Sequence, residues 1–297
     1  MGILRTAAAV SCGIPTILAT VPSIPGYTLT WSDDFTGAKG SAPSSSSWNF
    51  DTGTSYPGAA ANWGTGEIES YTSDSSNIAL TGNGSLAITP VLSGGSWTSA
   101  RIESVPMNFS AESGSKMIIQ ASVMMPSITG DQAVGYWPAF WALGSAFRGN
   151  YWNWPGVGEF DIMENVNGLD WVSGTLHCGV DPGGPCNETD GLTGQTPCPG
   201  SACQGNYHTY SITVDRSVSP ETLTWAVDGQ SYHSVSETDV GNATTWSSAV
   251  DDTKFILFNV AIGGSYPDKV YKATTPISAT AGGYSMYVDY VAVYNAS

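Results

Sequence analysis

Three acidic residues lie close together in a chain that contains few charged residues. Glu159, Asp161 and Glu164 fall within the stretch 158–165, whereas only 11% of the 297 residues are charged. Two carboxyl groups roughly 5–5.5 Å apart hydrolyse a glycosidic bond with retention, one as nucleophile and the other as acid and then base. A third carboxylate between them raises the pKa of a neighbour by like-charge repulsion. The residue types and their spacing therefore suit glycoside hydrolysis.

The strand that carries these acids must be irregular if all three are to share a face. Side chains alternate along a strand, so Glu159 and Asp161 point away from the apolar Phe160. Glu164 lies at an odd spacing from Glu159, and a regular strand would drive it into the core at a cost of several kcal/mol. A β-bulge around Ile162-Met163 returns Glu164 to the shared face and leaves the methionine buried. The sequence therefore predicts a bulge there and three acids in one groove.

Aromatic residues surround the acidic stretch in the sequence. Trp137 and Trp141 precede it, and the connecting loop contains Tyr151, Trp152 and Trp154. Sugar rings present apolar C–H faces to aromatic planes, so a groove with acids on its floor and tryptophan at its rim suits a polysaccharide. The alternatives for the acids are a solvated acidic edge strand and a calcium site. For any single tryptophan, packing in the core is the commoner role.

The elements that position these residues are short strands. Glycine and proline together account for 35 + 17 = 52 residues, which favours many strands and turns over long helices. From residue 27 onward the composition is uniform, which indicates a single domain over 27–297 with a surface loop at 44–47. Period-2 alternation in 207–214 and 286–294 predicts half-buried strands. The pattern is typical of an all-β sandwich, with strands expected at 28–35, 77–81, 85–91, 100–105, 116–125, 136–143, 157–166, 171–177, 207–214, 222–228, 254–262 and 284–294.

Charge and motif content exclude several classes of function. The formal net charge is −16, which disfavours nucleic acid and anionic membrane surfaces as partners. The sequence contains no Gly-x-Ser-x-Gly, His-Glu-x-x-His, Gly-x-x-x-x-Gly-Lys or Gly-x-Gly-x-x-Gly motif, and no apolar run of about 18 residues that would span a bilayer. We expect a soluble protein that meets neutral polar ligands.

Several features predict export. Residues 1–19 combine one positive charge, an apolar stretch and a small residue near the end, as in a cleaved signal peptide; a buried first strand or helix is the alternative. Cys12 would then be lost, and the remaining four cysteines would form two disulfides that close one long loop, in any of three pairings. A zinc site is the alternative for these four. They are Cys178, Cys186, Cys198 and Cys203; glycosylation sequons begin at Asn83, Asn108, Asn187, Asn242 and Asn295.

The acidic stretch and the segment Trp137-Pro-Ala-Phe-Trp141 resemble glycoside hydrolase family 16, the laminarinase and lichenase family. The resemblance implies a β-jelly-roll sandwich of two antiparallel sheets, of the concanavalin A-like type, with an open substrate groove. It implies Glu159 as nucleophile, Asp161 as its assistant and Glu164 as general acid/base, and the bulged spacing is similar to the β-1,3-glucanase branch. Further matching segments are Trp31-Ser-Asp-Asp-Phe35, Ser99-Ala-Arg-Ile102, Tyr207-His-Thr-Tyr210, Asn259-Val-Ala-Ile-Gly-Gly264 and Met286-Tyr-Val-Asp-Tyr-Val-Ala-Val-Tyr294.

The same resemblance implies substrate-binding residues and a metal. No cofactor is expected for catalysis, but relatives hold a structural calcium ion through a residue that matches Asp289. Glu69 stands where laminarinases commonly have Gln, and the cysteine-bearing loop is absent from typical bacterial laminarinases, so the linkage preference stays open. Sugar contacts are expected from Arg101, Trp137, Trp141, Trp154, His177, Asn62, Glu67 and Tyr71, for some of which a purely structural hydrogen bond is the alternative.

The predicted function is that of a secreted, monomeric, retaining endo-β-glycanase. Its expected substrate is β-1,3-glucan or mixed β-1,3/1,4-glucan. An endo-β-1,3-galactanase and a transglycosylase with the same site are alternatives within the family. A carbohydrate-binding, lectin-like sandwich without turnover is an alternative of another class.

Overall fold

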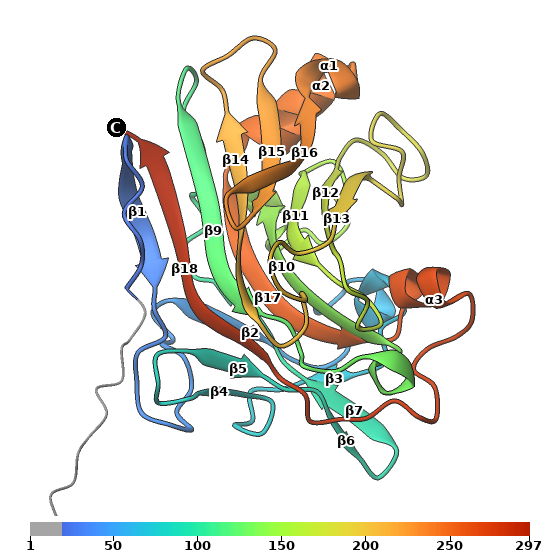
Figure 1. The fold of residues 1–297 in the computed structure, drawn as a ribbon. Coiled ribbons are helices and arrows are strands. Elements are labelled where there is room, and N and C mark those ends of the chain that lie inside the picture. The colour runs from blue at the N-terminus through green and yellow to red at the C-terminus, as the bar shows by residue number, and fades with distance from the viewer. Residues whose placement is uncertain (1–19) are drawn as a thin grey trace, which may run out of the picture.

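Two large antiparallel sheets form the body of the computed structural model, which describes residues 20–297 (Figure 1). The first sheet runs in the order β16 (Gln230–Ser236), β15 (Thr222–Val227), β14 (Tyr207–Asp215), β9 (Lys116–Met124), β18 (Met286–Ala296), β5 (Leu86–Ile88) and β4 (Ile78–Leu80), with β1 (Tyr27–Asp33) also paired to β18. The second runs β13 (Leu192–Thr196), β12 (Val172–His177), β11 (Glu159–Glu164), β10 (Tyr136–Gly144), β17 (Lys254–Ile262), β8 (Arg101–Ser104) and β2 (Trp48–Asp51).

The remaining elements are small. A three-stranded sheet contains β3 (Ser70–Tyr71), β7 (Ser96–Ser99) and β6 (Val91–Ser93). The helices are α1 (Glu237–Val240), α2 (Ala243–Trp246) and α3 (Ser265–Tyr271), and the single helical turns are η1 (Ala61–Gly64), η2 (Gly130–Ala133), η3 (Ser145–Phe147) and η4 (Ser247–Asp251). None of the helices in the described part of the chain has the length and apolar character needed to cross a membrane.

The core lies between the two large sheets. Phe160 of β11 and Ile212 of β14 come from opposite sheets and are fully buried in one continuous apolar cluster. Phe140 and Phe258 stack within it at 4.8 Å between ring centroids. Burial of each such side chain stabilises the fold by about 1.5–3 kcal/mol. The core thus packs against the inner face of the seven-stranded sheet, which contains β11 and its acids.

Each of the twelve strand ranges predicted from the sequence contains a strand, and the predicted loop at 44–47 is an exposed turn. Several strands were not predicted. Three of them, β2, β13 and β16, lie at sheet edges, where one side faces solvent and a polar composition is tolerated. The sequence Gln-Ser-Tyr-His-Ser-Val-Ser of β16 lacks a clear apolar face for this reason.

The prediction that 286–294 is half-buried is wrong for its second half. Tyr290 through Tyr294 are all buried, because residues near the start of the described chain cover the outer face of β18. Val21 and Ile24 pack on this face, and the Tyr294 hydroxyl donates to the carbonyl oxygen of Pro22 at 2.7 Å. The fold therefore includes residues before 27. The predicted signal peptide, residues 1–19 with Cys12, lies outside the described residues.

Candidate active site

Strand β11 contains the predicted bulge. Two consecutive residues of β10 pair with Met163 and Asp161, so Ile162 between them is the extra residue. The register with β12 shifts over the same interval, between Asp161 and Glu164. Met163 is fully buried, as predicted. The strand lies between β10 and β12 in the middle of the sheet, so the alternative of a solvated edge strand is wrong.

A tryptophan from the opposite sheet contacts the bulge on its core-facing side. The indole nitrogen of Trp225, on β15, donates to the main-chain oxygen of Asp161 at 2.7 Å, and the tryptophan is fully buried. Gly174 on β12 makes room for this ring, because a Cβ at Gly174 would lie 2.3 Å from Trp225 Cδ1. The bulge is therefore held by a contact that crosses the core.

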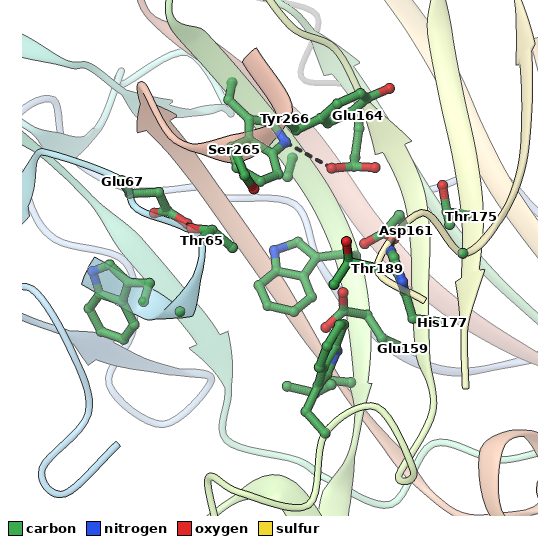
Figure 2. A pocket seen from close by; sticks show the side chains of 18 of the residues that line it. Thr65, Glu67, Glu159, Asp161, Glu164, Thr175, His177, Thr189, Ser265 and Tyr266 are labelled. Atoms are coloured by element: carbon green, nitrogen blue, oxygen red, sulfur yellow. Dashed lines mark hydrogen bonds and ion pairs between the residues drawn. The ribbon is translucent and has the colours of Figure 1, made fainter. Parts of the chain in front are cut away.

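The three acids face one groove of about 980 Å³ on the outer side of the seven-stranded sheet (Figure 2). Asp161 and Glu164 are buried, and Glu159 is half-buried. Aromatic side chains and neutral polar groups make up most of the rest of the lining, including Tyr56, Trp63, Trp137, Trp141, Trp152, Trp154, Thr175, Thr189, Thr193, Gln195, Asn259 and Tyr266. The arrangement predicted for the acid trio is thus present in the fold.

Burial and mutual repulsion control the ionisation of the two glutamates. Burial, followed by the charge of Asp161, raises the pKa of Glu159 to about 8. The same two causes raise the pKa of Glu164 well above its usual range. The indole N–H of Trp137 donates to Glu164 Oε1 at 2.8 Å and favours the carboxylate, but this bond does not offset the rise in the pKa of Glu164. Both shifts favour the protonated forms of the glutamates, which is the form that a general acid needs at Glu164.

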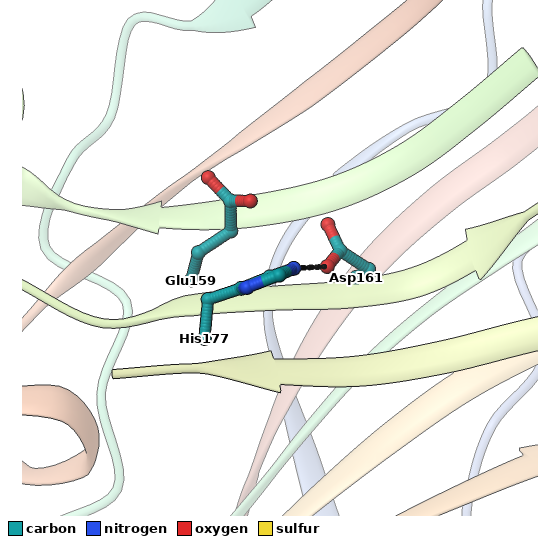
Figure 3. Close-up of side chains that lie close together, drawn as sticks. All are labelled: Glu159, Asp161 and His177. Atoms are coloured by element: carbon teal, nitrogen blue, oxygen red, sulfur yellow. Dashed lines mark ion pairs between the residues drawn. The ribbon is translucent and has the colours of Figure 1, made fainter. Parts of the chain in front are cut away.

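His177 of β12 lies beside two of the acids (Figure 3). Its Nε2 is 3.3 Å from Asp161 Oδ2, and its Nδ1 is 2.7 Å from Oε2 of Glu188. Burial alone would lower the pKa of the imidazole, but the hydrogen bonds to Asp161 and Glu188 outweigh burial and raise it well above its usual value. Ligand atoms of Glu159, Asp161 and His177 lie within 4.8 Å of one another, and this is the one group of three acids or histidines in residues 20–297 that could hold a metal ion.

Arg101 lines the groove among aromatic rings. Its guanidinium is 4.6 Å from the ring centroid of Trp63 and 4.8 Å from that of Trp141. Its Nε pairs with Asp51 Oδ2 at 3.1 Å, and both side chains are buried. These contacts fix a positive charge in the groove wall and orient the two indole rings.

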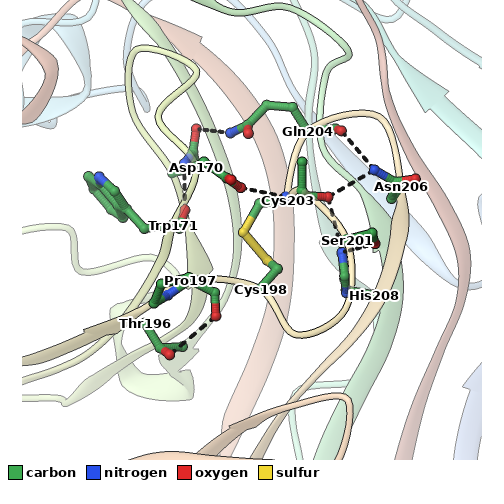
Figure 4. The surroundings of a disulfide bond; sticks show 12 residues. Asp170, Trp171, Thr196, Pro197, Cys198, Ser201, Cys203, Gln204, Asn206 and His208 are labelled. Atoms are coloured by element: carbon green, nitrogen blue, oxygen red, sulfur yellow. Dashed lines mark hydrogen bonds between the residues drawn. A yellow bond between two sulfur atoms is a disulfide. The ribbon is translucent and has the colours of Figure 1, made fainter.

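The four described cysteines form two disulfides, Cys178–Cys186 and Cys198–Cys203. Two disulfides were predicted, but each closes its own short loop rather than both closing one long loop, and the alternative of a zinc site is wrong. In the second loop, shown in Figure 4, the N–H of Cys203 donates to Asp170 Oδ1 at 2.8 Å. The first loop begins directly after His177.

Comparisons with known proteins identify the family. A family model described as the XgeA-like catalytic GH16 domain matches residues 79–210. The crystal structure of endo-1,3-beta-glucanase from Streptomyces sioyaensis is 51% identical, covers 94% of this chain and 100% of that chain, and superposes with a TM-score of 0.91. The chain belongs to glycoside hydrolase family 16. The predicted family and the jelly-roll fold are confirmed.

More distant relatives also match. Glucan endo-1,3-beta-glucosidase A1 from Niallia circulans is 30% identical over 96% of this chain and 40% of its own length. Beta-glucanase from Rhodothermus marinus is 28% identical over 91% of this chain and 86% of its own length. The chain spans 40% and 34% of the length of two curated relatives, the Niallia enzyme and the clotting factor G alpha subunit of Tachypleus tridentatus.

The fold brings most of the sugar contacts implied by the family resemblance to the groove. Arg101, Trp137, Trp141, Trp154, His177 and Glu67 all line it. Trp141 is oriented by a bond from its indole nitrogen to Asn259 Oδ1 at 2.8 Å, and Trp154 packs on His177 with 5.6 Å between ring centroids.

Two of the predicted contact residues are elsewhere. Asn62 is exposed and outside the groove lining; its carbonyl oxygen accepts main-chain hydrogen bonds in the turn that follows. Tyr71 is buried behind the lining, where its hydroxyl donates to Glu67 Oε2 at 2.7 Å and accepts from Asn259 Nδ2 at 3.1 Å. Tyr71 therefore positions two side chains instead of contacting the groove. Neither outcome was visible from sequence spacing, because each depends on how the segment 52–70 folds over β17.

The residue predicted to bind calcium lies away from the groove. Asp289 is half-buried at a register shift of β18, and its pKa is raised by burial. It belongs to no group of three acids or histidines within residues 20–297, so a calcium ion there would depend on main-chain oxygens. Calcium binding stays a prediction.

Sequence reasoning missed the groove residues that come from loops and from α3. Thr65, Thr189, Asp190, Ser265, Tyr266 and Lys269 all line the groove. Gly263 and Gly264, which precede α3, were the available signal, because both have positive φ and allow the sharp exit from β17. The buried Glu188 was also missed.

Proposed function

We propose that this chain is a secreted, retaining endo-β-glycanase that hydrolyses β-1,3-glucan or mixed β-1,3/1,4-glucan. The observation that carries the proposal is that Glu159 and Glu164 face one groove from the two ends of a bulged strand, with Asp161 between them. The names of the relatives support the substrate class, since the Streptomyces sioyaensis and Niallia circulans proteins are both described as endo-1,3-beta-glucan hydrolases.

In the first step, Glu159 acts in its ionised form, which the charges of His177 and Arg101 favour. A carboxylate oxygen attacks the anomeric carbon, and the bond from that carbon to the glycosidic oxygen breaks. Glu164 donates its proton to the departing oxygen, so the leaving chain ends in a hydroxyl. The raised pKa of Glu164 suits it to hold that proton beforehand. The product of this step is an ester between Glu159 and the sugar.

In the second step, a water molecule replaces the leaving chain. The carboxylate of Glu164 now takes a proton from the water, whose oxygen attacks the anomeric carbon and releases Glu159 as a carboxylate. Two inversions give net retention. Asp161 and His177 lie beside Glu159, and the imidazolium favours the charged form of the nucleophile.

The groove lining supports a neutral polysaccharide as substrate. Indole planes at Trp137 and Trp154 offer apolar faces for sugar rings, and threonine and glutamine side chains offer neutral hydrogen bonds. The acidic chain disfavours a polyanion in the same place.

The test is a Glu159→Gln variant measured against laminarin, lichenan, β-1,3-galactan and xyloglucan. Wild type should release reducing ends from laminarin or lichenan with retained configuration, while Glu159→Gln should bind the same substrate and release none. Glu112→Gln, at an exposed acid outside the groove, is the matched control and should keep full activity. Normal release of reducing ends by Glu159→Gln would refute the assignment, and binding without turnover by wild type would favour a lectin-like protein.

One relative supports a galactose-containing glycan as a second class of substrate. A keratan-sulfate endo-1,4-beta-galactosidase from Sphingobacterium multivorum is 27% identical over 93% of this chain. Release from β-1,3-galactan alone would make the chain a galactanase with the same chemistry. Products longer than the substrate would make it a transglycosylase, in which a sugar hydroxyl replaces water in the second step.

The compartment and assembly are part of the same proposal. The two disulfides fit an oxidising environment, which supports secretion and removal of residues 1–19. We propose that the secreted protein acts as a monomer, needs no cofactor for catalysis, and has no nucleic-acid or membrane partner.

A further inference from the structure

Glu188 is a buried acid that the proposed mechanism does not use. It follows Cys186 in the loop between β12 and β13, and its side chain is fully buried. Oε2 lies 2.7 Å from Nδ1 of His177, and Oε1 accepts the N–H of Cys178 at 2.8 Å. A buried carboxylate is costly unless it is paired and hydrogen-bonded. Within residues 20–297, the one basic side chain paired with Glu188 is the imidazole of His177.

The bond from Glu188 determines where the other nitrogen of the ring points. With Nδ1 held by Glu188, Nε2 is directed at Asp161 Oδ2, and the Glu159 carboxylate lies next to both (Figure 3). The titratable groups around His177 are Glu159, Asp161 and, farther along the strand, Glu164 from β11, and Glu188 from the loop. Arg101 from β8 acts on Glu159 from farther away.

The disulfide ties the two partners together. His177 directly precedes Cys178, and Glu188 follows two residues after Cys186, so the Cys178–Cys186 bond joins the backbone segments that carry the acid and the imidazole. The Cα atoms of the two cysteines are 5.4 Å apart. Closure of this loop by the disulfide therefore also places Glu188 next to the imidazole ring of His177.

We propose that Glu188 is a positioning residue, which holds the His177 ring in its protonated form with Nε2 against Asp161 and Glu159. The proposal rests on the proposed function, because it assigns Glu188 a task in the ionisation of the nucleophile. Without the Glu188 charge, the imidazole keeps Asp161 as its one ion-paired acid and loses its proton at a lower pH. The neutral ring then no longer favours the Glu159 carboxylate, so the pKa of Glu159 rises and the acidic limb of activity moves to higher pH.

The chain offers a matched control outside the groove. Asp228 has the same arrangement: Oδ2 lies 2.6 Å from Nδ1 of His208, and Oδ1 accepts the N–H of the next residue, Thr209, at 2.8 Å. Neither Asp228 nor His208 lines the groove. Asp228→Asn removes an equivalent acid from an equivalent histidine, so it reports the structural part of the effect alone.

The experiment combines an NMR titration of the histidine rings with steady-state kinetics on laminarin, using wild type, Glu188→Gln and Asp228→Asn. The sequence has three histidines, which keeps the ring spectra simple. In wild type, both nitrogens of His177 should stay protonated above the ordinary pKa of histidine, near 6.5. Glu188→Gln should lower that pKa and reduce kcat by about 10- to 100-fold, the equivalent of one hydrogen bond to a charged group. The acidic limb of its kcat/KM profile should lie at higher pH than in wild type, while Asp228→Asn changes neither quantity.

The ring titration keeps failure of this inference separate from failure of the proposed function. Ordinary titration of His177 in wild type would overturn the inference even if Glu188→Gln does not fold. So would an unchanged His177 titration in a folded Glu188→Gln, or equal losses of kcat in Glu188→Gln and Asp228→Asn. If wild type releases no product but the ring titrates as expected, the proposed function fails and the placement of His177 by Glu188 stands.

Discussion

Replacement of Trp225 by phenylalanine should lower the catalytic rate, although Trp225 lies in the sheet opposite the groove. The indole nitrogen of Trp225 donates to the main-chain oxygen of Asp161 at the bulge. Phenylalanine keeps an aromatic ring but has no N–H. The carbonyl at the bulge would then lose its partner from the other sheet, and β11 could relax toward a regular strand. Because Glu164 reaches the groove only through the bulge, relaxation would move it relative to Glu159.

The expected loss of stability follows from the contacts of the ring. Loss of a buried hydrogen bond costs about 1–3 kcal/mol. The smaller ring leaves unfilled space in the core, for which we add about 1 kcal/mol. The sum is roughly 2–4 kcal/mol, which corresponds to a fall in Tm of roughly 4–16 °C for a protein of this size. A displacement of the acid by about 1 Å should lower kcat by about 10- to 100-fold.

The assay compares thermal unfolding and laminarin hydrolysis for Trp225→Phe and Trp246→Phe. Trp246 is also buried and donates its indole N–H to Glu221 Oε2 at 2.9 Å, but it lies outside the groove lining. Trp246→Phe should therefore lose stability and keep kcat. Gly174→Ala should reproduce the Trp225→Phe result, because the added methyl group would displace the indole ring.

Equal kcat values in Trp225→Phe and Trp246→Phe would refute this reasoning. The strand pairings of β11 would then suffice to hold the bulge, and the bond across the core would contribute to stability alone.

Two further predictions concern ionisation and metal binding. The pKa of Glu159 is raised from its ordinary 4.5 to about 8, so folding favours the protonated form of this side chain. The stability that Glu159 contributes is therefore full below pH 4.5 and is lost as the pH rises toward 8. The Tm of Glu159→Gln should therefore match that of wild type near pH 4 and exceed it increasingly up to pH 8; a difference that does not vary with pH would contradict the raised pKa. For the predicted calcium ion, a chelator should lower the Tm of wild type and leave that of Asp289→Asn unchanged, and an equal response of both proteins would exclude Asp289 as a ligand.

The sequence by itself determined the features that depend on local order. The odd spacing between Glu159 and Glu164 required a bulge, because period-2 alternation would otherwise bury a charge, and the register of β11 with β10 confirms it. Segments of β-branched or aromatic residues between turn-forming residues also located twelve of the strands. The family motif further ordered the roles proposed for the two glutamates, which spacing alone does not distinguish.

Tertiary structure decided everything that depends on which distant segments meet. Trp225 supports the bulge from the other sheet, and Glu188 reaches His177 through a loop whose closure the cysteine spacing left open. Asn62 and Tyr71 lie outside the lining because the segment that carries them folds over β17 in a way that no short-range pattern records. The physical reason is that alternation along a strand shows which face of the strand is buried, whereas the packing of whole sheets and loops determines the hydrogen-bond partner of each side chain.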